Sequence, residues 1–355
     1  MRLACFEPCG CRNTLATIAR LHLMKHILSQ VTCVYAFVIV CLSGQSVWAI
    51  DKPNVVIILA DDLGYGDLSC QGATKVHTPN IDRLAAEGRR FTDAHSPASV
   101  CTPTRYNLLT GRYAWRTWNS SGTVWANDPM LIDPDRFTLA DLMKRQGYRT
   151  ACLGKWHLGF GSPDMPGWDD VLGPDYNGPL RPGPLDVGFD YFWGFPHVGQ
   201  LPHVIIENDR VLGLEPDDPI RTLPDKRPGF ERNYLERPRL GLAAALGVSG
   251  GQAARYEHEQ LAVMLTQRAV RWIREQSSHQ PFFLYFAHRN IHGPLRPNAR
   301  FRGKSEIGVY GDFLLELDWS VGEVLGALDE QGLADNARRA ALPLGSRHWR
   351  VNQPL

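Results

Sequence analysis

The sequence Asn54-Val-Val-Ile-Ile-Leu-Ala60 is an uninterrupted apolar run rich in β-branched residues, and Asp61-Asp62-Leu-Gly-Tyr-Gly-Asp67 follows it directly. Such a run is typical of a strand buried on both faces of a parallel sheet. Open α/β sheets bind their ligands at the carboxyl ends of such strands, so Asp61 and Asp62 are candidate ligand-binding residues. Two adjacent carboxylates repel each other, and a hard divalent cation would remove that cost. A solvated acidic turn is the alternative interpretation.

Helix and strand patterns alternate along the rest of the chain, as expected for one large α/β domain. The fraction of apolar residues, 44% of 355 residues, suffices for a core of that size, and the net charge of +1 gives no reason to expect a nucleic-acid partner. Capping signals or apolar periodicity predict helices over residues 78–88, 137–147 and 257–276, and apolar runs predict strands over 148–153 and 281–287.

The first 49 residues resemble an export signal. Residues 27–50 carry no charge, Lys25 precedes their apolar centre, and Val47 and Ala49 suit a cleavage site after Ala49. An uncleaved membrane anchor is the alternative, and Met24 is an alternative start that would make residues 1–23 an upstream extension. We therefore expect an exported protein, periplasmic or extracellular, or lysosomal or secreted in a eukaryote, with a membrane partner only if the signal stays uncleaved.

Cleavage would leave three cysteines, Cys70, Cys101 and Cys152, a number that argues against a disulfide framework. Cys101 begins the motif Cys-Thr-Pro-Thr-Arg105, in which Pro103 could open a helix capped by Thr102. The helix N-terminus and the Arg105 guanidinium would then both favour an anion beside the thiol. A buried structural thiol is the alternative; a Cys-phosphatase loop has five residues between Cys and Arg, and this chain has three.

A second candidate group follows the predicted strand at residues 148–153, in Gly154-Lys-Trp-His-Leu-Gly159. Lys155 and His157 are two residues apart at a strand end, so both are expected to point toward the same crevice. Lysine could neutralise a bound anion, and a neutral imidazole could accept a proton.

These segments together resemble the type I sulfatase family of the alkaline-phosphatase superfamily. The resemblance rests on Cys-x-Pro-x-Arg followed by Leu-Leu-Thr-Gly, on Gly-Tyr-x-Thr-x-x-x-Gly-Lys-Trp-His, on the Asp-Asp-Leu-Gly-Tyr-Gly-Asp turn and on Gly188-Phe-Asp-Tyr-Phe-Trp-Gly194. It implies an α/β fold of the alkaline-phosphatase-like type, a sandwich of a mostly parallel mixed sheet between helices.

The resemblance also implies a chemistry for the first group of residues. In that family the cysteine, here Cys101, is oxidised to formylglycine by a formylglycine-generating or other sulfatase-maturing enzyme, and the aldehyde hydrate attacks the sulfur of a sulfate ester. Asp61 and Asp62 would bind Ca²⁺ together with residue 101. Arg105 would orient and stabilise the hydrate.

The remaining roles fall on residues that follow two later strands. Lys155 would balance the sulfate charge, and His157 would remove a proton from the hydrate so that sulfate is released. In His288-Arg-Asn-Ile-His-Gly-Pro294, His292 is the better match for the histidine that protonates the leaving group and contacts sulfate, and His288 is the fallback.

The resemblance covers residues 54–336, so we expect a catalytic domain over 50–336. The family continues with an apolar strand that ends in Ser-Asp-Asn-Gly and supplies two more metal ligands, and later with a second lysine. Residues 337–350 contain four arginines, no acid and no strand pattern. We therefore expect residues 337–355 to be a non-family, out-of-frame tail, the C-terminal part of the fold to be missing, and the sheet to have an unpaired edge.

The predicted function is hydrolysis of sulfate esters, with a sulfated small molecule or carbohydrate as substrate. The sequence leaves open whether that is an aryl sulfate, a polysaccharide or a glycosaminoglycan. A phosphonate or phosphate monoester hydrolase of the same superfamily and an inactive truncated fragment are the two alternatives.

Overall fold

The computed structural model describes residues 52–120, 122–170, 172–199, 202–224, 246–277 and 279–343. The predicted export signal at residues 1–49 lies outside these ranges. Within them, no helix combines the length and apolarity needed to cross a membrane.

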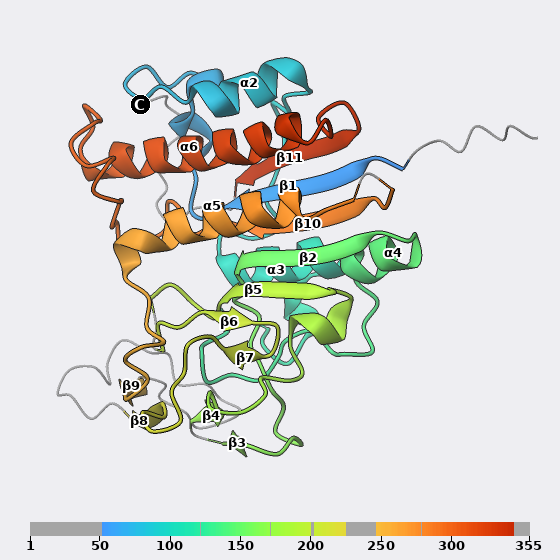
Figure 1. Cartoon of the computed structure of the whole chain (residues 1–355), viewed down its shortest axis with the longest axis vertical. Helices are drawn as coiled ribbons and strands as arrows, with labels where there is room; N and C mark the ends of the chain where they lie inside the picture. Colours follow the sequence, from blue (N-terminus) through green and yellow to red (C-terminus); the bar gives the residue numbers. More distant parts are fainter. Residues whose placement is uncertain are drawn as a thin grey trace, which may run out of the picture. The chain divides into compact units, whose positions relative to one another are not determined.

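A seven-stranded sheet forms the centre of the described chain, with the order β11-β1-β10-β2-β5-β6-β7 (Figure 1). Its first five strands run parallel, and β5, β6 and β7 pair antiparallel. The expected mostly parallel mixed sheet is thus confirmed. Its strands are β1 (Asn54–Ala60), β2 (Arg149–Lys155), β5 (Tyr191–Phe195), β6 (Ile206–Glu207), β7 (Arg210–Val211), β10 (Phe282–Ala287) and β11 (Ala337–Pro343). Short antiparallel pairs join β3 (Trp168–Asp169) to β4 (Gly173–Pro174) and β8 (Arg221–Pro224) to β9 (Leu246–Ser249).

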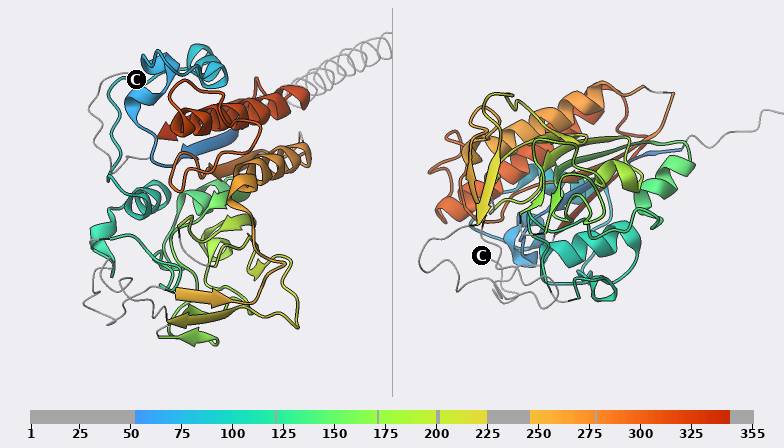
Figure 2. Two further views of the ribbon diagram at one scale, coloured as in Figure 1. Left: turned by 90° about the vertical axis from the view of Figure 1, so that its left-hand side faces the viewer. Right: turned by 90° about the horizontal axis from the view of Figure 1, so that it is seen from below.

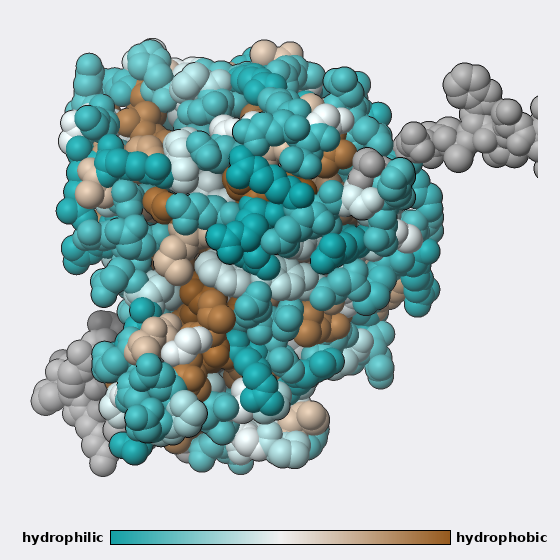
Figure 3. All heavy atoms as spheres, viewed as in Figure 1, coloured by the Kyte–Doolittle hydropathy of each residue, from teal (hydrophilic) through white to brown (hydrophobic). Residues whose placement is uncertain are grey.

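Helices cover both faces of the sheet, which completes the expected sandwich (Figure 2). The helices α5 (His258–Arg274) and α6 (Val309–Glu330) pack on one face with α2 (Pro79–Glu87), and α3 (Cys101–Thr110) and α4 (Leu139–Arg145) pack on the other. Each face has its own apolar core because the parallel strands are buried on both sides. The outward faces of α5 and α6 are mainly hydrophilic (Figure 3), as amphipathic surface helices require. Single-turn helices are η1 (Tyr65–Asp67), η2 (Ser69–Gln71), η3 (Ala114–Arg116) and η4 (Pro184–Val187).

The helix α3 begins two residues earlier than the sequence predicts. It starts at Cys101, so Pro103 occupies its third position, where a missing N–H costs nothing because the first N–H groups have no helical partner. Thr102 is therefore not the cap. Its hydroxyl donates instead to the backbone oxygen of His157 (2.9 Å). The helix ends at Gly111 in a left-handed conformation, which glycine adopts without strain.

The helix α6 holds several loops at the carboxyl edge of the sheet. Tyr310 donates a hydrogen bond to Asp67 (2.5 Å), in the turn that follows β1. Glu316 is fully buried and accepts from the side-chain amide of Asn290 (2.9 Å), in the loop that follows β10. The Asp318 carboxylate accepts from backbone N–H groups in the first turn of α2. Such buried, satisfied hydrogen bonds fix the loops that carry the candidate site residues.

The prediction that no strand follows residue 336 is wrong for residues 337–343, and the out-of-frame origin of residues 337–355 stays a prediction. Residues Ala337–Pro343 form β11, which pairs in parallel with the whole of β1, from Asn54 beside Ala337 to Ala60 beside Pro343. The segment has no apolar alternation because it is an edge strand, and Arg338 is exposed to solvent. Tertiary pairing with β1 overrides its weak strand pattern.

Candidate active site

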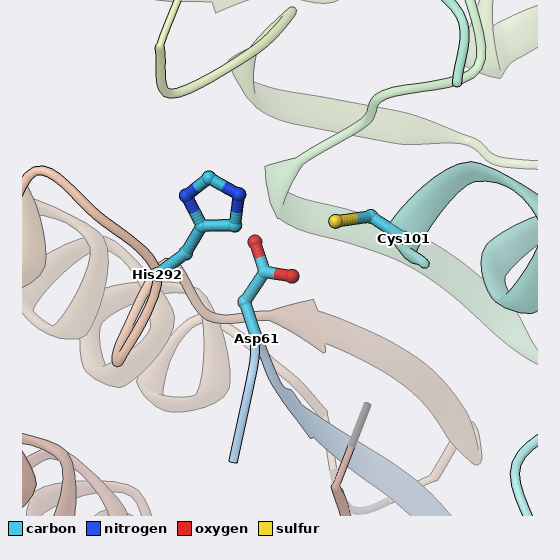
Figure 4. A group of neighbouring side chains, drawn as sticks. All are labelled: Asp61, Cys101 and His292. Atoms are coloured by element: carbon cyan, nitrogen blue, oxygen red, sulfur yellow. The ribbon is translucent and has the colours of Figure 1, made fainter. Parts of the chain in front are cut away.

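Three predicted site residues meet at the carboxyl edge of the parallel strands. Asp61 follows β1, Cys101 begins α3, and His292 lies in the loop after β10 (Figure 4). A carboxylate oxygen of Asp61, the Cys101 sulfur and an imidazole nitrogen of His292 all lie within 4.8 Å of one another. Residues 231 positions apart in the sequence thus form one cluster, at the edge where open α/β sheets bind ligands.

Asp61 is fully buried between two cationic side chains. Its Oδ2 lies 2.6 Å from Lys155 Nζ and 3.5 Å from Arg105 Nη2. Burial alone would raise the pKa of Asp61, but the charges of Lys155 and Arg105 outweigh it and hold the pKa below the usual range. The carboxyl group is therefore ionised at neutral pH, as a metal ligand must be.

Glycine brings the lysine-bearing strand close to its neighbours. Gly154, which precedes Lys155, has φ +108°, and a Cβ there would lie 2.1 Å from the backbone oxygen of Ala287 in β10. A Cβ on Gly194 in β5 would lie 1.9 Å from the oxygen of Gly154. No other residue fits this approach.

The Cys101 thiol lies 3.5 Å from Lys155 Nζ and is almost fully buried. Burial raises the pKa of this thiol to about 11, in spite of the opposing charge of Lys155. A thiol with such a pKa is protonated at neutral pH and is a poor nucleophile. The unmodified cysteine is therefore badly suited to the chemistry that its position suggests.

Arg105 reaches the same place from the second turn of α3. It is fully buried, and its Nη1 donates to the backbone oxygen of Lys155 at 2.8 Å. Its Nε has no hydrogen-bond partner among the described residues. An unpaired, buried guanidinium N–H group beside Cys101 fits the predicted role of orienting an oxygen-bearing group there.

Asp62 and His292 form the more open side of the cluster. Asp62 has φ +61° and faces His292, whose Nε2 lies 3.7 Å from Asp62 Oδ2. The His292 Nδ1 pairs with the carbonyl oxygen of Gly293 at 2.6 Å, so Nδ1 carries a proton and Nε2 faces the site. His288, the fallback, is fully buried, and its Nδ1 accepts from the backbone N–H of Asn290.

The two aspartates suit a hard cation. The Asp61 Oδ1 is buried and has no hydrogen-bond partner among the described residues, and Asp62 offers a second carboxylate on the next residue. Carboxylate oxygens are the ligands that Ca²⁺ prefers, whereas thiol and imidazole groups suit softer metals. The strand β11 ends beside Ala60, the residue that precedes Asp61.

His157 lies just beyond the end of β2, in a left-handed backbone conformation with φ +55°. Its N–H donates to the oxygen of Pro196 (3.0 Å), and its oxygen accepts from Thr102. Neither ring nitrogen has a hydrogen-bond partner among the described residues. Burial lowers the pKa of His157 well below its usual value, and His197 and Lys155 add to the effect. The ring is therefore neutral and able to accept a proton.

Sequence reasoning missed His197, which lies just after β5. Its ring centroid is 4.1 Å from that of His157 and 6.4 Å from that of His292. The rule that singled out Lys155, a polar residue at the carboxyl end of a parallel strand, could also have found His197. The structure thus brings all the predicted site residues except His288 around one centre, and adds His197 to them.

Comparison with known proteins places this chain among the sulfatases. A family profile described as "Sulfatase" matches residues 53–337. The N-acetylgalactosamine-6-O-sulfatase of Bacteroides thetaiotaomicron is 40% identical over 301 residues, which cover 80% of this chain and 57% of that protein. Human arylsulfatase A is 33% identical over 298 residues, which cover 80% of this chain and 50% of that protein. The chain thus spans less than two thirds of the length of these relatives.

Solved structures agree with these matches. A structure from work on glycosaminoglycan metabolism by Bacteroides thetaiotaomicron superimposes with a TM-score of 0.69 at 39% identity, covering 81% of this chain and 61% of that one. A sulfatase from Pseudoalteromonas sp., with a TM-score of 0.59 at 24% identity, covers 85% of this chain and 57% of that one and shares the fold.

Proposed function

The chain belongs to the sulfatase family, and on that basis we propose that it hydrolyses sulfate esters at the cluster of Asp61, Cys101 and His292. One observation carries the proposal: a cysteine, a metal-type carboxylate and a histidine converge within 4.8 Å beside a buried lysine. Hydrolysis of an ester of a tetrahedral anion needs positive charge to bind the anion, a nucleophile and a proton donor to the leaving group. This cluster and the lysine beside it offer residues for all three.

Residue 101 requires chemical conversion before it can act. The raised pKa of its thiol, about 11, disfavours direct thiolate attack. Oxidised to formylglycine, residue 101 would supply a hydroxyl group of the aldehyde hydrate as the nucleophile toward sulfur. A calcium ion held by Asp61, Asp62 and residue 101 would polarise the sulfate oxygens.

The surrounding side chains would bind the anion and move protons. Lys155 and Arg105 would neutralise the charge of the sulfate and of the hydrate. The Nδ1 proton of His292 is held by the Gly293 carbonyl, so His292 would donate a proton from Nε2 to the leaving alcohol only as the doubly protonated imidazolium, a form that the carboxylates of Asp61 and Asp62 favour. His157, neutral because of its lowered pKa, would accept a proton from residue 101.

The test combines mass analysis with turnover. The chain is produced in cells that possess a sulfatase-maturing enzyme, and we expect the tryptic peptide that contains residue 101 to lose about 18 Da relative to unmodified cysteine. The matured protein should hydrolyse an aryl sulfate in the presence of calcium, and the Cys101→Ala variant should not. An unmodified thiol together with no turnover would refute the proposal.

Two rival functions give different results in the same assay. A phosphonate or phosphate monoester hydrolase would turn over the aryl phosphate or phosphonate faster than the aryl sulfate by orders of magnitude. An inactive fragment would carry formylglycine and yet hydrolyse neither ester. We favour the sulfatase because a relative 40% identical to this chain bears that name.

The substrate class and the cell compartment belong to the same proposal. Because that relative is named for N-acetylgalactosamine 6-sulfate, a sulfated carbohydrate is the substrate to test first. Export by way of residues 1–49 would bring the enzyme to such polymers outside the cytoplasm, and the maturing enzyme is the one protein partner that we expect. Fractionation of expressing cells, with N-terminal sequencing of the product, tests the export.

A further inference from the structure

His197 lies between the two histidines to which the proposed reaction assigns proton transfer. Its side chain is 8% exposed, and its ring meets that of His157 edge to face at 4.1 Å, with an interplanar angle of 88°. The ring centroid of His292 lies 6.4 Å from that of His197. The indole of Trp125 stacks on the His197 ring, with 5.9 Å between their centroids. His197 is thus part of the wall of the site.

One hydrogen bond fixes where the proton of this ring lies. The backbone N–H of Gly199 donates to His197 Nδ1 at 2.8 Å, so Nδ1 must present its lone pair. The proton of the neutral ring is therefore on Nε2. Among the described residues Nε2 makes no hydrogen bond, and it is not one of the fully buried polar atoms, so it stays accessible to a ligand.

The charge state of the ring agrees with that assignment. Burial lowers the pKa of His197 well below its usual value, and the charges of Lys155 and His292 add to the effect. The ring is neutral at neutral pH, so its Nε2 is a fixed hydrogen-bond donor. A donor that a largely buried ring holds in one position, and that no described residue uses, is available to a ligand that accepts from it.

We propose that His197 contacts the substrate and donates a hydrogen bond from Nε2 to an oxygen of its sulfate group. The inference rests on the proposed function, because the acceptor is the anion that Lys155 and Arg105 attract. A neutral donor would add a directed contact to the anion near His157 and His292. Because it carries no charge, it would not lower the pKa of these two histidines further, as Lys155 already does. If the ring served only as packing between Trp125 and His157, the position of its proton would have no consequence.

The test measures binding without turnover. In a Cys101→Ala background, titration calorimetry with inorganic sulfate compares three residues at position 197: histidine, phenylalanine and glutamine. Phenylalanine keeps a ring between Trp125 and His157 but lacks the donor. Since a hydrogen bond to a charged group is lost, we expect His197→Phe to weaken sulfate binding by about 10- to 100-fold. His197→Gln can place an amide N–H near the Nε2 position and should recover most of the affinity.

Turnover of an aryl sulfate by the matured chain supplies the second readout. His197→Phe should lower kcat/KM by a similar factor, and His197→Gln should lie between the two. His95→Phe is the matched control, because His95 is exposed and pairs only with Asp93 at 2.7 Å, and it should change neither readout. Thermal unfolding of each variant checks that the fold is kept.

The outcomes separate this inference from the function on which it rests. Sulfate binding by His197→Phe equal to that of its parent would overturn the donor role. If the phenylalanine variant does not fold, a folded glutamine variant that binds sulfate no better than His197→Ala overturns it equally. No turnover of any sulfate ester by the matured, unsubstituted chain would refute the proposed function, and sulfate binding would still decide the role of His197.

Discussion

Replacement of Lys155 by methionine should destabilise the fold strongly, because the lysine forms a fully buried ion pair with Asp61. The Nζ–Oδ2 distance is 2.6 Å, and at an effective dielectric constant of about 20 the attraction is about 6 kcal/mol. Desolvation of both charges offsets part of it, yet removal of the lysine leaves a buried carboxylate whose nearest arginine, Arg105, lies 3.5 Å away. We expect a loss of about 3–5 kcal/mol in the free energy of unfolding.

The pH dependence of this loss has a defined sign. In the native chain the pKa of Asp61 lies below its usual value, so the ionised carboxylate favours the folded state above the unfolded pKa of about 3.9, and this stability is lost as the pH falls through the folded pKa. In Lys155→Met, the largest charge that opposes the effect of burial is absent, so burial raises the pKa of Asp61. The carboxyl group then binds a proton more readily in the folded state, so the cost of the substitution is largest at neutral pH and shrinks toward pH 4.

Urea denaturation in the presence of a calcium chelator, near neutral pH and at about pH 4.5, measures both effects. Lys144→Met is the matched control, because Lys144 lies the same 2.6 Å from Asp190 while its side chain is 51% exposed. A surface pair of this kind contributes at most about 1 kcal/mol. Equal losses in the two variants, or a loss in Lys155→Met that does not change with pH, would refute the reasoning.

Three further substitutions test other parts of the structure. Gly154→Ala brings a methyl group within 2.1 Å of a carbonyl oxygen of β10, and it should lower the free energy of unfolding by at least ~3 kcal/mol. Gly147→Ala is the control, because Gly147 also has a positive φ but no atom within 4 Å of the added methyl group, and it should cost about 1–2 kcal/mol. Equal losses by urea denaturation would contradict this. Glu316→Ala removes one of the two acceptors for the side-chain amide of Asn290, whose backbone oxygen accepts from the N–H of Asp61. Calorimetric titration should therefore show weaker calcium binding, with a smaller loss in Glu316→Gln. Unchanged affinity would exclude a positioning role for Glu316. His292→Gln should slow hydrolysis of a sugar sulfate by about 10²–10⁴-fold and of nitrophenyl sulfate much less, since nitrophenolate leaves without a proton; equal factors in the two assays would argue against a proton donor.

The sequence alone determined the elements whose signals are local. The apolar run of β1, the capping box of Thr138 and Asp141 at α4, and the left-handed Gly111 after α3 depend on neighbours within a few residues, and the structure has each of them. The placement of Asp61 and Lys155 at one edge also followed from sequence, because the carboxyl ends of parallel strands meet there, whereas the resemblance to sulfatases implied that Cys101 lies beside them.

Only the tertiary structure decided how these groups face one another. Strand alternation predicted that Lys155 and His157 share a direction, but β2 ends at Lys155 and His157 adopts φ +55°. The lysine pairs with Asp61, 94 residues away, and the lowered pKa values of Asp61 and His157 follow from their burial and from the charges around them. No sequence interval encodes such distances.

Contacts between residues far apart in the chain also explain two features that the sequence analysis did not predict, the strand β11 and the position of His197. The residues of β11 are arginine and small apolar side chains without a strand pattern, and they form a strand because β1 offers an unpaired edge. His197 follows β5 closely, and only the fold brings its ring beside those of His157 and His292, where the ends of β5, β2 and β10 converge. Local signals specify elements, whereas pairing partners and charge environments arise from contacts between residues far apart in the chain.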